Sequence, residues 1–259
     1  MTRTITKYTG ALLLAMGLTV SAAKADDVAI SGDIGAYTQY VWRGVEQTVN
    51  STAVQGDLGV SMGNVSAGVW FSNSYPAAAP QYAGKDVVEF DWTVDYSGSF
   101  GDTGLGYSVG GIAYTYLYDS ASNFPELYAG LSFDSMLSPS LTAYYTVSDS
   151  QSKAYLAGDL WIDLGVSGSV ADFDLSGTIS YANWKKDAVN RPLGAVDTWK
   201  SGLSLATIGV SKDVDVAGVT MTPSLTFTYP LAKKQADGNR YIYGVSVKSE
   251  FIAGVNFSY

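Results

Sequence analysis

The chain has 259 residues, including 28 Gly, 19 Tyr, 9 Phe and 6 Trp, and it contains neither His nor Cys. The absence of His excludes Ser-His-Asp and Cys-His catalysis, and the absence of Cys excludes disulfides and Cys/His zinc sites. A formal net charge of −9 makes a nucleic-acid partner a poor fit, because such proteins carry a basic surface. With 47% hydrophobic and 15% charged residues, the chain is not disordered, and its Gly-rich, aromatic-rich composition favours an all-β protein.

Residues 1–25 have the pattern of a secretory signal peptide. Arg3 and Lys7 precede an apolar stretch over 10–20, and Ala23-Lys24-Ala25 forms an A-x-A cleavage site. A membrane anchor is the alternative, but the apolar stretch is about half of the roughly 20 residues that a spanning helix needs. Cleavage after Ala25 leaves one domain over 26–259. Because the segment carries three bases and no acid, the net charge then falls from −9 to −12.

The rest of the chain alternates between apolar and polar residues with period two, which predicts strands. In the stretch 87–96, for example, Phe90, Trp92 and Val94 fall on one face, and Glu89 and Asp91 fall on the other. The pattern predicts twelve strands near 28–42, 53–63, 65–73, 86–100, 104–117, 125–133, 140–148, 153–166, 172–184, 198–210, 219–229 and 249–259. A slip in the alternation near Ala206–Ile208 predicts a bulge in the tenth strand.

An even number of strands, with mostly long connections on one side and mostly short turns on the other, is typical of an outer-membrane barrel. We therefore predict a transmembrane antiparallel up-and-down β-barrel of about twelve strands. A soluble β-sandwich or jelly roll would also alternate. Aromatic residues near the predicted strand ends favour the barrel, because they are typical of membrane-interface girdles: Tyr40, Trp42, Trp70, Phe71, Phe100, Tyr181, Trp184, Trp199, Tyr229 and Tyr259.

Acidic side chains dominate the predicted inward face. The candidate pore-lining residues are Asp33, Tyr37, Arg43, Asp57, Glu89, Asp91, Asp95, Asp159, Asp163 and Asp174, and Glu126 and Glu250 share the face. Arg43 and Lys153 are the main inward bases, whereas the other bases except Lys212 lie in or beside the long connections. An acidic wall favours cations. The alternative is a polar interior that does not conduct. Spacing along one face of a strand disfavours a Ca²⁺ or acid–base site, so we expect no metal, cofactor or catalytic residue.

The N-terminal third resembles the TorF-like porin family, also called the Gcw_chp family. The resemblance rests on three segments in order, namely 40–48 (YVWRGVEQT), 53–57 (AVQGD) and 68–73 (GVWFSN), with Glu46 where the family usually has Ser. The matching residues are Tyr40, Arg43, Gly44, Gln47, Thr48, Gln55, Gly56, Trp70, Ser72 and Asn73. The resemblance implies an outer-membrane barrel of porin type with no established substrate. We expect Arg43 to pair with a lumen acid, with a place in a constriction as the alternative.

Together these observations predict a porin-like channel in the bacterial outer membrane that passes small hydrophilic solutes and prefers cations. The alternative is a closed barrel that serves as a structural or adhesion protein through its outer loops. A barrel enzyme is disfavoured, because outer-membrane phospholipases and omptins rely on His. The expected partners are outer-membrane lipids and lipopolysaccharide, the solutes, and the barrel assembly machinery, which would recognise the aromatic end Phe257–Tyr259. The sequence leaves the oligomeric state open.

Overall fold

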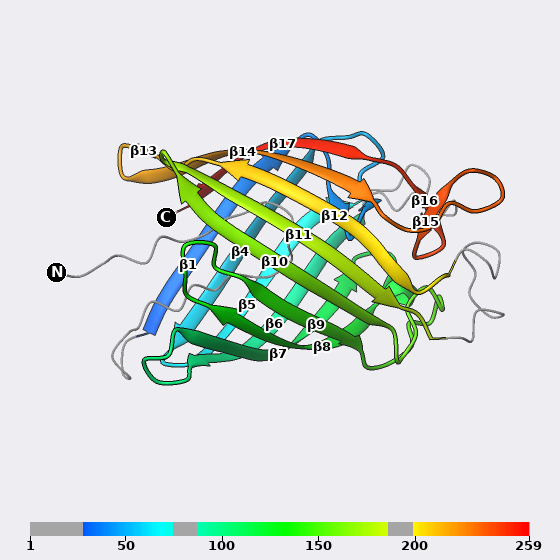
Figure 1. Cartoon of the computed structure of the whole chain (residues 1–259), viewed down its shortest axis with the longest axis horizontal. Coiled ribbons are helices and arrows are strands. Elements are labelled where there is room, and N and C mark those ends of the chain that lie inside the picture. The colour runs from blue at the N-terminus through cyan, green and yellow to red at the C-terminus, as the bar shows by residue number, and fades with distance from the viewer. Residues whose placement is uncertain (1–27, 75–86, 186–198, 259) are drawn as a thin grey trace.

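The computed structural model describes residues 28–74, 87–185 and 199–258, and nearly all of its regular structure is β-strand. Figure 1 shows long strands wrapped around a common axis. The twelve strands of the wall are β1 (Val28–Tyr37), β4 (Ala53–Met62), β5 (Val65–Ser74), β6 (Val87–Ser99), β7 (Leu105–Tyr116), β8 (Phe124–Phe133), β9 (Ser140–Thr146), β10 (Leu160–Val170), β11 (Phe173–Asn183), β12 (Gly202–Ser211), β14 (Val219–Pro230) and β17 (Glu250–Ser258).

These strands close into a ring. Each strand pairs antiparallel with the wall strands before and after it, and β17 pairs with both β14 and β1. The ring confirms the predicted twelve-stranded up-and-down barrel. Closure gives both long edges of every wall strand a hydrogen-bonding partner. A membrane-spanning sheet requires this, because hydrocarbon offers no partner for an open edge.

The two ends of the barrel differ in their connections. One end carries the short turns, such as Gly63–Asn64 and Ala171–Asp172. Both residues of the latter turn have positive φ, as in a type I′ hairpin. At this end β13 (Val214–Val216) prolongs the β12–β14 hairpin. The opposite end, which we call the long-loop end, carries β15 (Arg240–Ile242) and β16 (Val245–Val247), as Figure 1 shows.

Alternation along the strands separates a polar inside from an apolar outside. On β6, Asp91, Thr93 and Asp95 are buried in the interior, whereas Trp92 and Val94 between them are more than half exposed. Outward Val, Leu, Ile and Phe side chains repeat this pattern on the other wall strands, and many are 40% exposed or more. A continuous apolar exterior on a closed barrel is the surface that a lipid bilayer covers. No helix among the described residues is long and apolar enough to cross a membrane.

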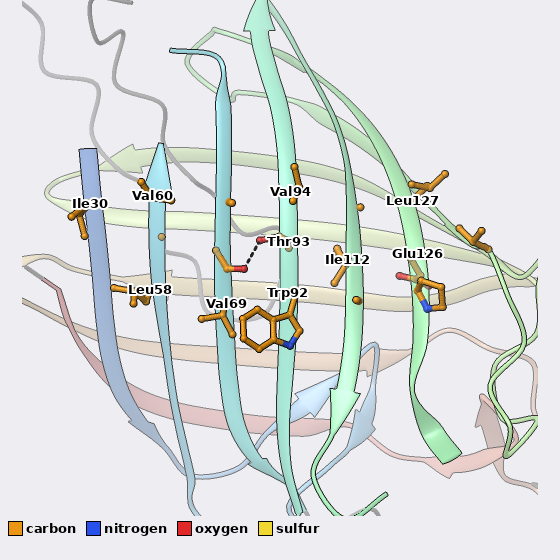
Figure 2. A pocket seen from close by; sticks show the side chains of 17 residues that line it. Ile30, Leu58, Val60, Val69, Trp92, Thr93, Val94, Ile112, Glu126 and Leu127 are labelled. Carbon is orange, nitrogen blue, oxygen red and sulfur yellow. Dashed lines mark hydrogen bonds between the residues drawn. The ribbon is translucent and has the colours of Figure 1, made fainter. Parts of the chain in front are cut away.

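The exterior carries one shallow apolar groove across β1 and β4–β8. Outward side chains form most of its lining, including Leu58, Val69, Trp92, Val94 and Leu127, and small residues such as Ala67 and Gly111 leave the depression between them. Figure 2 shows these larger side chains projecting from neighbouring strands, with the hydrogen bond from the Thr93 hydroxyl to the Gly68 carbonyl among them. The groove belongs to the membrane-facing surface and is not part of the lumen.

The structure corrects one predicted strand. The eighth strand was expected over 153–166, but β10 begins at Leu160. The preceding residues form a compact turn in which the Ser150 amide donates to the Tyr155 carbonyl and the Asp159 carboxylate accepts from the Leu156 amide. Leu156 is therefore buried and does not face outward. The alternation of apolar residues continued through this turn by coincidence.

Other details of the strands also differ from expectation. The first wall strand ends at Tyr37, because the chain beyond it turns back into the barrel. The bulge in β12 is real but lies slightly upstream of the predicted slip. Ser180 pairs with Leu205 and Tyr181 pairs with Leu203, so Ser204 is the extra residue.

A charge on the outward face tests the assignment of the exterior to lipid. Val94 is 60% exposed near the middle of β6. We expect Val94→Lys to lower the free energy of unfolding by about 2–4 kcal/mol in phospholipid vesicles, because a charge at the bilayer midplane is poorly solvated. Urea titration followed by tryptophan fluorescence measures this, with Val94→Leu as the control. Equal stability of the two variants would show that Val94 does not face lipid.

Candidate functional site

Two hairpins fold into the long-loop end of the lumen. One consists of β2 (Val41–Trp42) and β3 (Val45–Glu46), and the other of β15 and β16. Each has a two-residue turn whose second residue is Gly, namely Arg43-Gly44 and Tyr243-Gly244. All four turn residues have positive φ, with 47° at Arg43 and 52° at Tyr243. Such turns favour Asn or Gly at the first position. The presence of Arg and Tyr therefore indicates that their side chains are needed at the tips.

The tip of the first hairpin is anchored to both the wall and the second hairpin. Arg43 Nη1 and Nη2 donate to the two carboxylate oxygens of Glu126 on β8, at 2.9 and 2.7 Å. Arg43 Nη1 also donates to the hydroxyl of Tyr243, at 2.6 Å. The Arg43 and Glu126 side chains are only 9% and 2% exposed. This buried, bidentate contact is the ion pair that we expected for Arg43, and it is the strongest geometry open to Arg and a carboxylate.

Aromatic rings and further donors complete the surroundings of this ion pair. The guanidinium carbon of Arg43 lies 4.6, 5.0 and 5.2 Å from the ring centroids of Trp42, Tyr144 and Trp161. These distances place the cation over π faces that attract it. Glu126 also accepts hydrogen bonds from the Tyr114 hydroxyl at 3.0 Å and from Thr146. Side chains from β7, β8, β9 and β10 therefore converge on one guanidinium.

The rings also join the two hairpins into one packed body. Tyr243 stacks on Trp42 with ring centroids 4.9 Å apart, and it meets Trp184 edge-on at 4.5 Å. Inward apolar side chains of β4 and β7–β12 pack against the hairpins in one buried cluster. Its members are Tyr40, Trp42, Val45, Ala53, Ile112, Tyr114, Phe124, Tyr144, Trp161, Ala182, Trp184, Trp199, Leu205, Ala232, Ile242 and Tyr243. We call the two hairpins the plug, because they lie inside the lumen at this end and pack against its wall.

The plug corrects part of the predicted aromatic girdle. Tyr40, Trp42, Trp184 and Trp199 are at most 7% exposed, and Trp70 packs against Tyr40 inside the barrel at a centroid distance of 5.2 Å. These rings stabilise the plug and do not contact the membrane interface. Phe100, Tyr181 and Tyr229 are exposed on the exterior, as a girdle requires, and Tyr259 lies outside the described residues. Sequence position near a strand end does not distinguish a ring that faces lipid from one that turns inward.

The predicted acids divide between three environments. Glu89, Asp91, Asp95 and Asp163 are buried in the interior on β6 and β10. Glu89 accepts from the Tyr116 hydroxyl, Asp95 from the Tyr128 hydroxyl, and Asp163 from Ser180 and the Trp161 indole. Asp33 and Asp57 are partly exposed and sit opposite each other on β1 and β4, with Tyr37 on the same inward face of β1. These residues therefore line the interior wall.

Two of the proposed acids have local roles. Asp159 lies in the connection before β10, where its carboxylate accepts from the Leu156 and Lys185 amides. Asp174 lies at the short-turn end and accepts from the Ser169 hydroxyl. Lys153, predicted to point inward, instead lies in an exposed loop and pairs with Asp149 at 2.8 Å. Its hydrogen bond lowers the pKa of Asp149.

Asp91 differs from the other buried acids. Its side chain is 0% exposed, and neither carboxylate oxygen has a hydrogen-bond partner among the described residues. Asp91 is paired across the sheet with Trp70 on β5 and Tyr114 on β7, whose hydroxyl reaches Glu126. An acid without donors in the interior is costly unless it is protonated or meets a cation. No cluster of acids among the described residues has the arrangement of a metal site.

The motif residues of the N-terminal third build the first hairpin and its support. The Tyr40 amide donates to Thr48 Oγ1 and the Gln47 amide to the Tyr40 carbonyl, which closes the base of the hairpin. The Asn73 side chain accepts a hydrogen bond from the Val54 amide and donates one to the Thr52 carbonyl. These bonds hold the chain in place where it leaves the first hairpin and enters β4. Further contacts include a long hydrogen bond from Gln55 to Ser72 and a close approach at Gly56, where a Cβ would lie 2.6 Å from the Asp33 carbonyl oxygen.

Sequence reasoning placed Glu126 on the inward face but missed the second hairpin and the aromatic wall residues around Arg43. Tyr243, Tyr144 and Trp161 were not singled out. Tyr243-Gly244 between two short β-prone stretches repeats the pattern of Arg43-Gly44, and this repeat was a usable signal.

Removing the side chain of Arg43 tests whether its ion pair with Glu126 stabilises the plug. We expect Arg43→Ala to lower the free energy of unfolding by about 3–5 kcal/mol, because it leaves Glu126 buried without its partner. Arg43→Ala/Glu126→Gln should recover part of the loss. Lys153→Ala is the matched control, since it removes an exposed ion pair worth about 0–1 kcal/mol. Urea unfolding in vesicles measures all three variants, and equal losses for Arg43→Ala and Lys153→Ala would contradict the buried ion pair.

Comparison with known proteins adds fold relatives and a family. No curated protein is significantly similar in sequence. The NanC porin structure is 14% identical with a TM-score of 0.49, covering 89% of this chain and 99% of that chain. The COG4313 outer membrane channel from Pseudomonas putida F1 is 12% identical with a TM-score of 0.47, covering 93% and 97%. Outer membrane phospholipase A from Escherichia coli is 11% identical with a TM-score of 0.47, covering 93% and 92%.

At these sequence identities the similarity is one of fold, and it assigns no activity to this protein. The family model described as "Bacterial protein of unknown function (Gcw_chp)" matches residues 21–251, which is most of the sequence. The plug, the buried interior acids and every wall strand except most of β17 lie within the matched region. The chain therefore belongs to the Gcw_chp family.

Proposed function

We propose that this protein is an outer-membrane channel for small hydrophilic solutes, with a preference for cations. In the state described above, the plug closes the channel at its long-loop end. The observation that carries the proposal is the imbalance of charge inside the barrel. Glu89, Asp91, Asp95, Glu126 and Asp163 are buried on the inward face of β6, β8 and β10, and Arg43 is the one base among them in the described part of the chain.

This imbalance supports passage of cations over anions. An acidic wall inside a low-dielectric shell raises the local concentration of cations and repels anions. Asp33 and Asp57 extend the acidic surface along β1 and β4. A barrel of twelve strands is wider than the eight-stranded barrels whose side chains fill the interior, and narrower than the 16–18-stranded porins. We propose that the space left by the plug, when it withdraws, serves as the passage.

Opening requires the two hairpins to move together or in sequence. The first hairpin is linked to the wall through the segments 38–40 and 47–52, and the second through 231–239 and 248–249. The hairpins hold each other through Arg43 and Tyr243. Short hairpins on such links can move without breaking the hydrogen bonds of the wall.

The same proposal places the protein in the bacterial outer membrane. Residues 1–25, proposed as a cleaved signal peptide, lie outside the described residues. The exterior would contact outer-membrane lipids and lipopolysaccharide, and the aromatic end Phe257–Tyr259 would be recognised by the barrel assembly machinery. We propose no catalytic activity, since the chain lacks the His on which known barrel enzymes rely.

A second candidate is a non-conducting barrel that acts through its outer loops. The packed aromatic cluster of the plug favours it, because sixteen buried apolar residues join the hairpins to the wall. Channel recording separates the two candidates.

Weakening the plug is expected to open the channel. In planar bilayers, we expect the wild-type protein to be mostly closed, and Arg43→Ala/Tyr243→Ala to raise the open probability several-fold, because it removes the contact between the hairpin tips. Lys153→Ala should behave as wild type. If correctly folded wild-type and double-variant proteins both show no conductance steps, the channel proposal is wrong and the second candidate stands.

The interior acids are expected to set the selectivity. In the Arg43→Ala/Tyr243→Ala background, Asp91→Asn/Asp95→Asn should lower the ratio of cation to anion permeability, because two carboxyl groups that can ionise once the lumen is hydrated leave the wall. Reversal potentials in a salt gradient measure the ratio. Asp174→Asn, at the short-turn end, is the control and should have the smaller effect. Unchanged reversal potentials for the β6 variant would show that these acids do not line the path.

A further inference from the structure

Arg43 occupies a binding site that belongs largely to the barrel wall. Among the described residues, its partners Glu126, Tyr144 and Trp161 lie on β8, β9 and β10, and Trp42 and Tyr243 come from the plug. When the first hairpin withdraws, the wall partners stay in place, because the ladders β8–β9 and β9–β10 fix them. The site then presents a carboxylate and two ring faces to the lumen.

The chemistry of the wall site matches a planar cation. Glu126 receives two parallel N–H donors from Arg43, and its orientation is held by the Tyr114 hydroxyl. A guanidinium offers such a fork and a flat face for stacking, whereas an alkylammonium offers a point charge. The rings of Tyr144 and Trp161 lie about the cation at 5.0 and 5.2 Å. Both features discriminate in favour of a guanidinium group.

Asp91 independently indicates that a cation other than Arg43 can bind in this region. It is fully buried on the inward face of β6, and both of its oxygens lack a partner among the described residues. Tyr114, which is paired with Asp91 across the sheet, bonds to Glu126 through its hydroxyl, so the two acids flank one side chain. A cation that enters this region can meet an acceptor that Arg43 leaves unused.

We infer that the wall site around Glu126 binds small solutes that carry a guanidinium group, in place of the Arg43 side chain. This deepens the proposed function by naming the class of solute, and it rests on that function for its route into the lumen. Solute and Arg43 cannot occupy the site at once. A guanidinium solute therefore binds only the state in which the hairpin has withdrawn, and it shifts the population toward that state.

The test measures binding without measuring current. Folded protein in detergent micelles is titrated with ethylguanidinium or ethylammonium by isothermal calorimetry. We expect Arg43→Ala to bind ethylguanidinium saturably and ethylammonium roughly tenfold or more weakly, because ethylammonium lacks the planar fork. Wild-type protein should bind ethylguanidinium more weakly than Arg43→Ala does, since Arg43 competes for the site.

Arg43→Ala/Glu126→Gln is the matched control, and it should abolish the binding. If Arg43→Ala does not fold, Arg43→Lys replaces it, and it should bind ethylguanidinium more tightly than the wild-type protein does, because an ammonium competes for a bidentate site less well than a guanidinium. The inference is overturned if the folded variant binds no ethylguanidinium, if it binds ethylammonium equally well, or if binding persists without Glu126. If the protein binds ethylguanidinium but shows no conductance, the binding site is supported and the channel proposal is wrong. If it conducts but does not bind ethylguanidinium, the channel proposal is supported and the binding site is wrong.

Discussion

A guanidinium buried inside a membrane barrel must have a carboxylate partner, and the arrangement of the plug follows from that requirement. Taking a charge out of water costs several kcal/mol, which only good geometry and further hydrogen bonds offset. Arg43 meets this condition with a bidentate contact to Glu126, a hydrogen bond to Tyr243 and three aromatic faces. The position of Glu126 on β8 therefore fixes how deeply the first hairpin enters the lumen.

The backbone turns of the plug adopt the conformation that this contact requires. Arg43 and Tyr243 both adopt the left-handed conformation that non-glycine residues avoid, and each is followed by a Gly that completes the turn. The conformations are tolerated because they direct two side chains at each other from separate hairpins. The aromatic cluster then excludes water, which strengthens the ion pair. The plug is thus held by a few polar contacts that are surrounded by a large cluster of buried apolar side chains.

The sequence predicted the wall better than the plug. Alternation on β6 separated inward acids from outward apolar residues, because membrane and lumen impose opposite polarity on adjacent residues. The same rule was misleading at 153–156, where a turn mimics a strand. Position near a predicted strand end was misleading for Trp42, which is part of the plug, and for Trp184, which packs against it. The partner of Arg43 could not be chosen by spacing, since Glu126 is far away in sequence and several inward acids were available. Only the three-dimensional register of β6–β10 around the hairpin selects it.

The account's central claim is that the two hairpins close an acidic lumen at the long-loop end. The chain has no Cys, so a single cysteine at the partly exposed, inward position of Asp57 reports access to the lumen without background. The measurement is the rate at which an impermeant cationic thiol reagent, added on the long-loop side of oriented membranes, modifies Asp57→Cys. The account predicts slow modification with the plug intact and much faster modification when Arg43→Ala/Tyr243→Ala is added. Equal, fast rates in both proteins would show that the hairpins do not close the lumen.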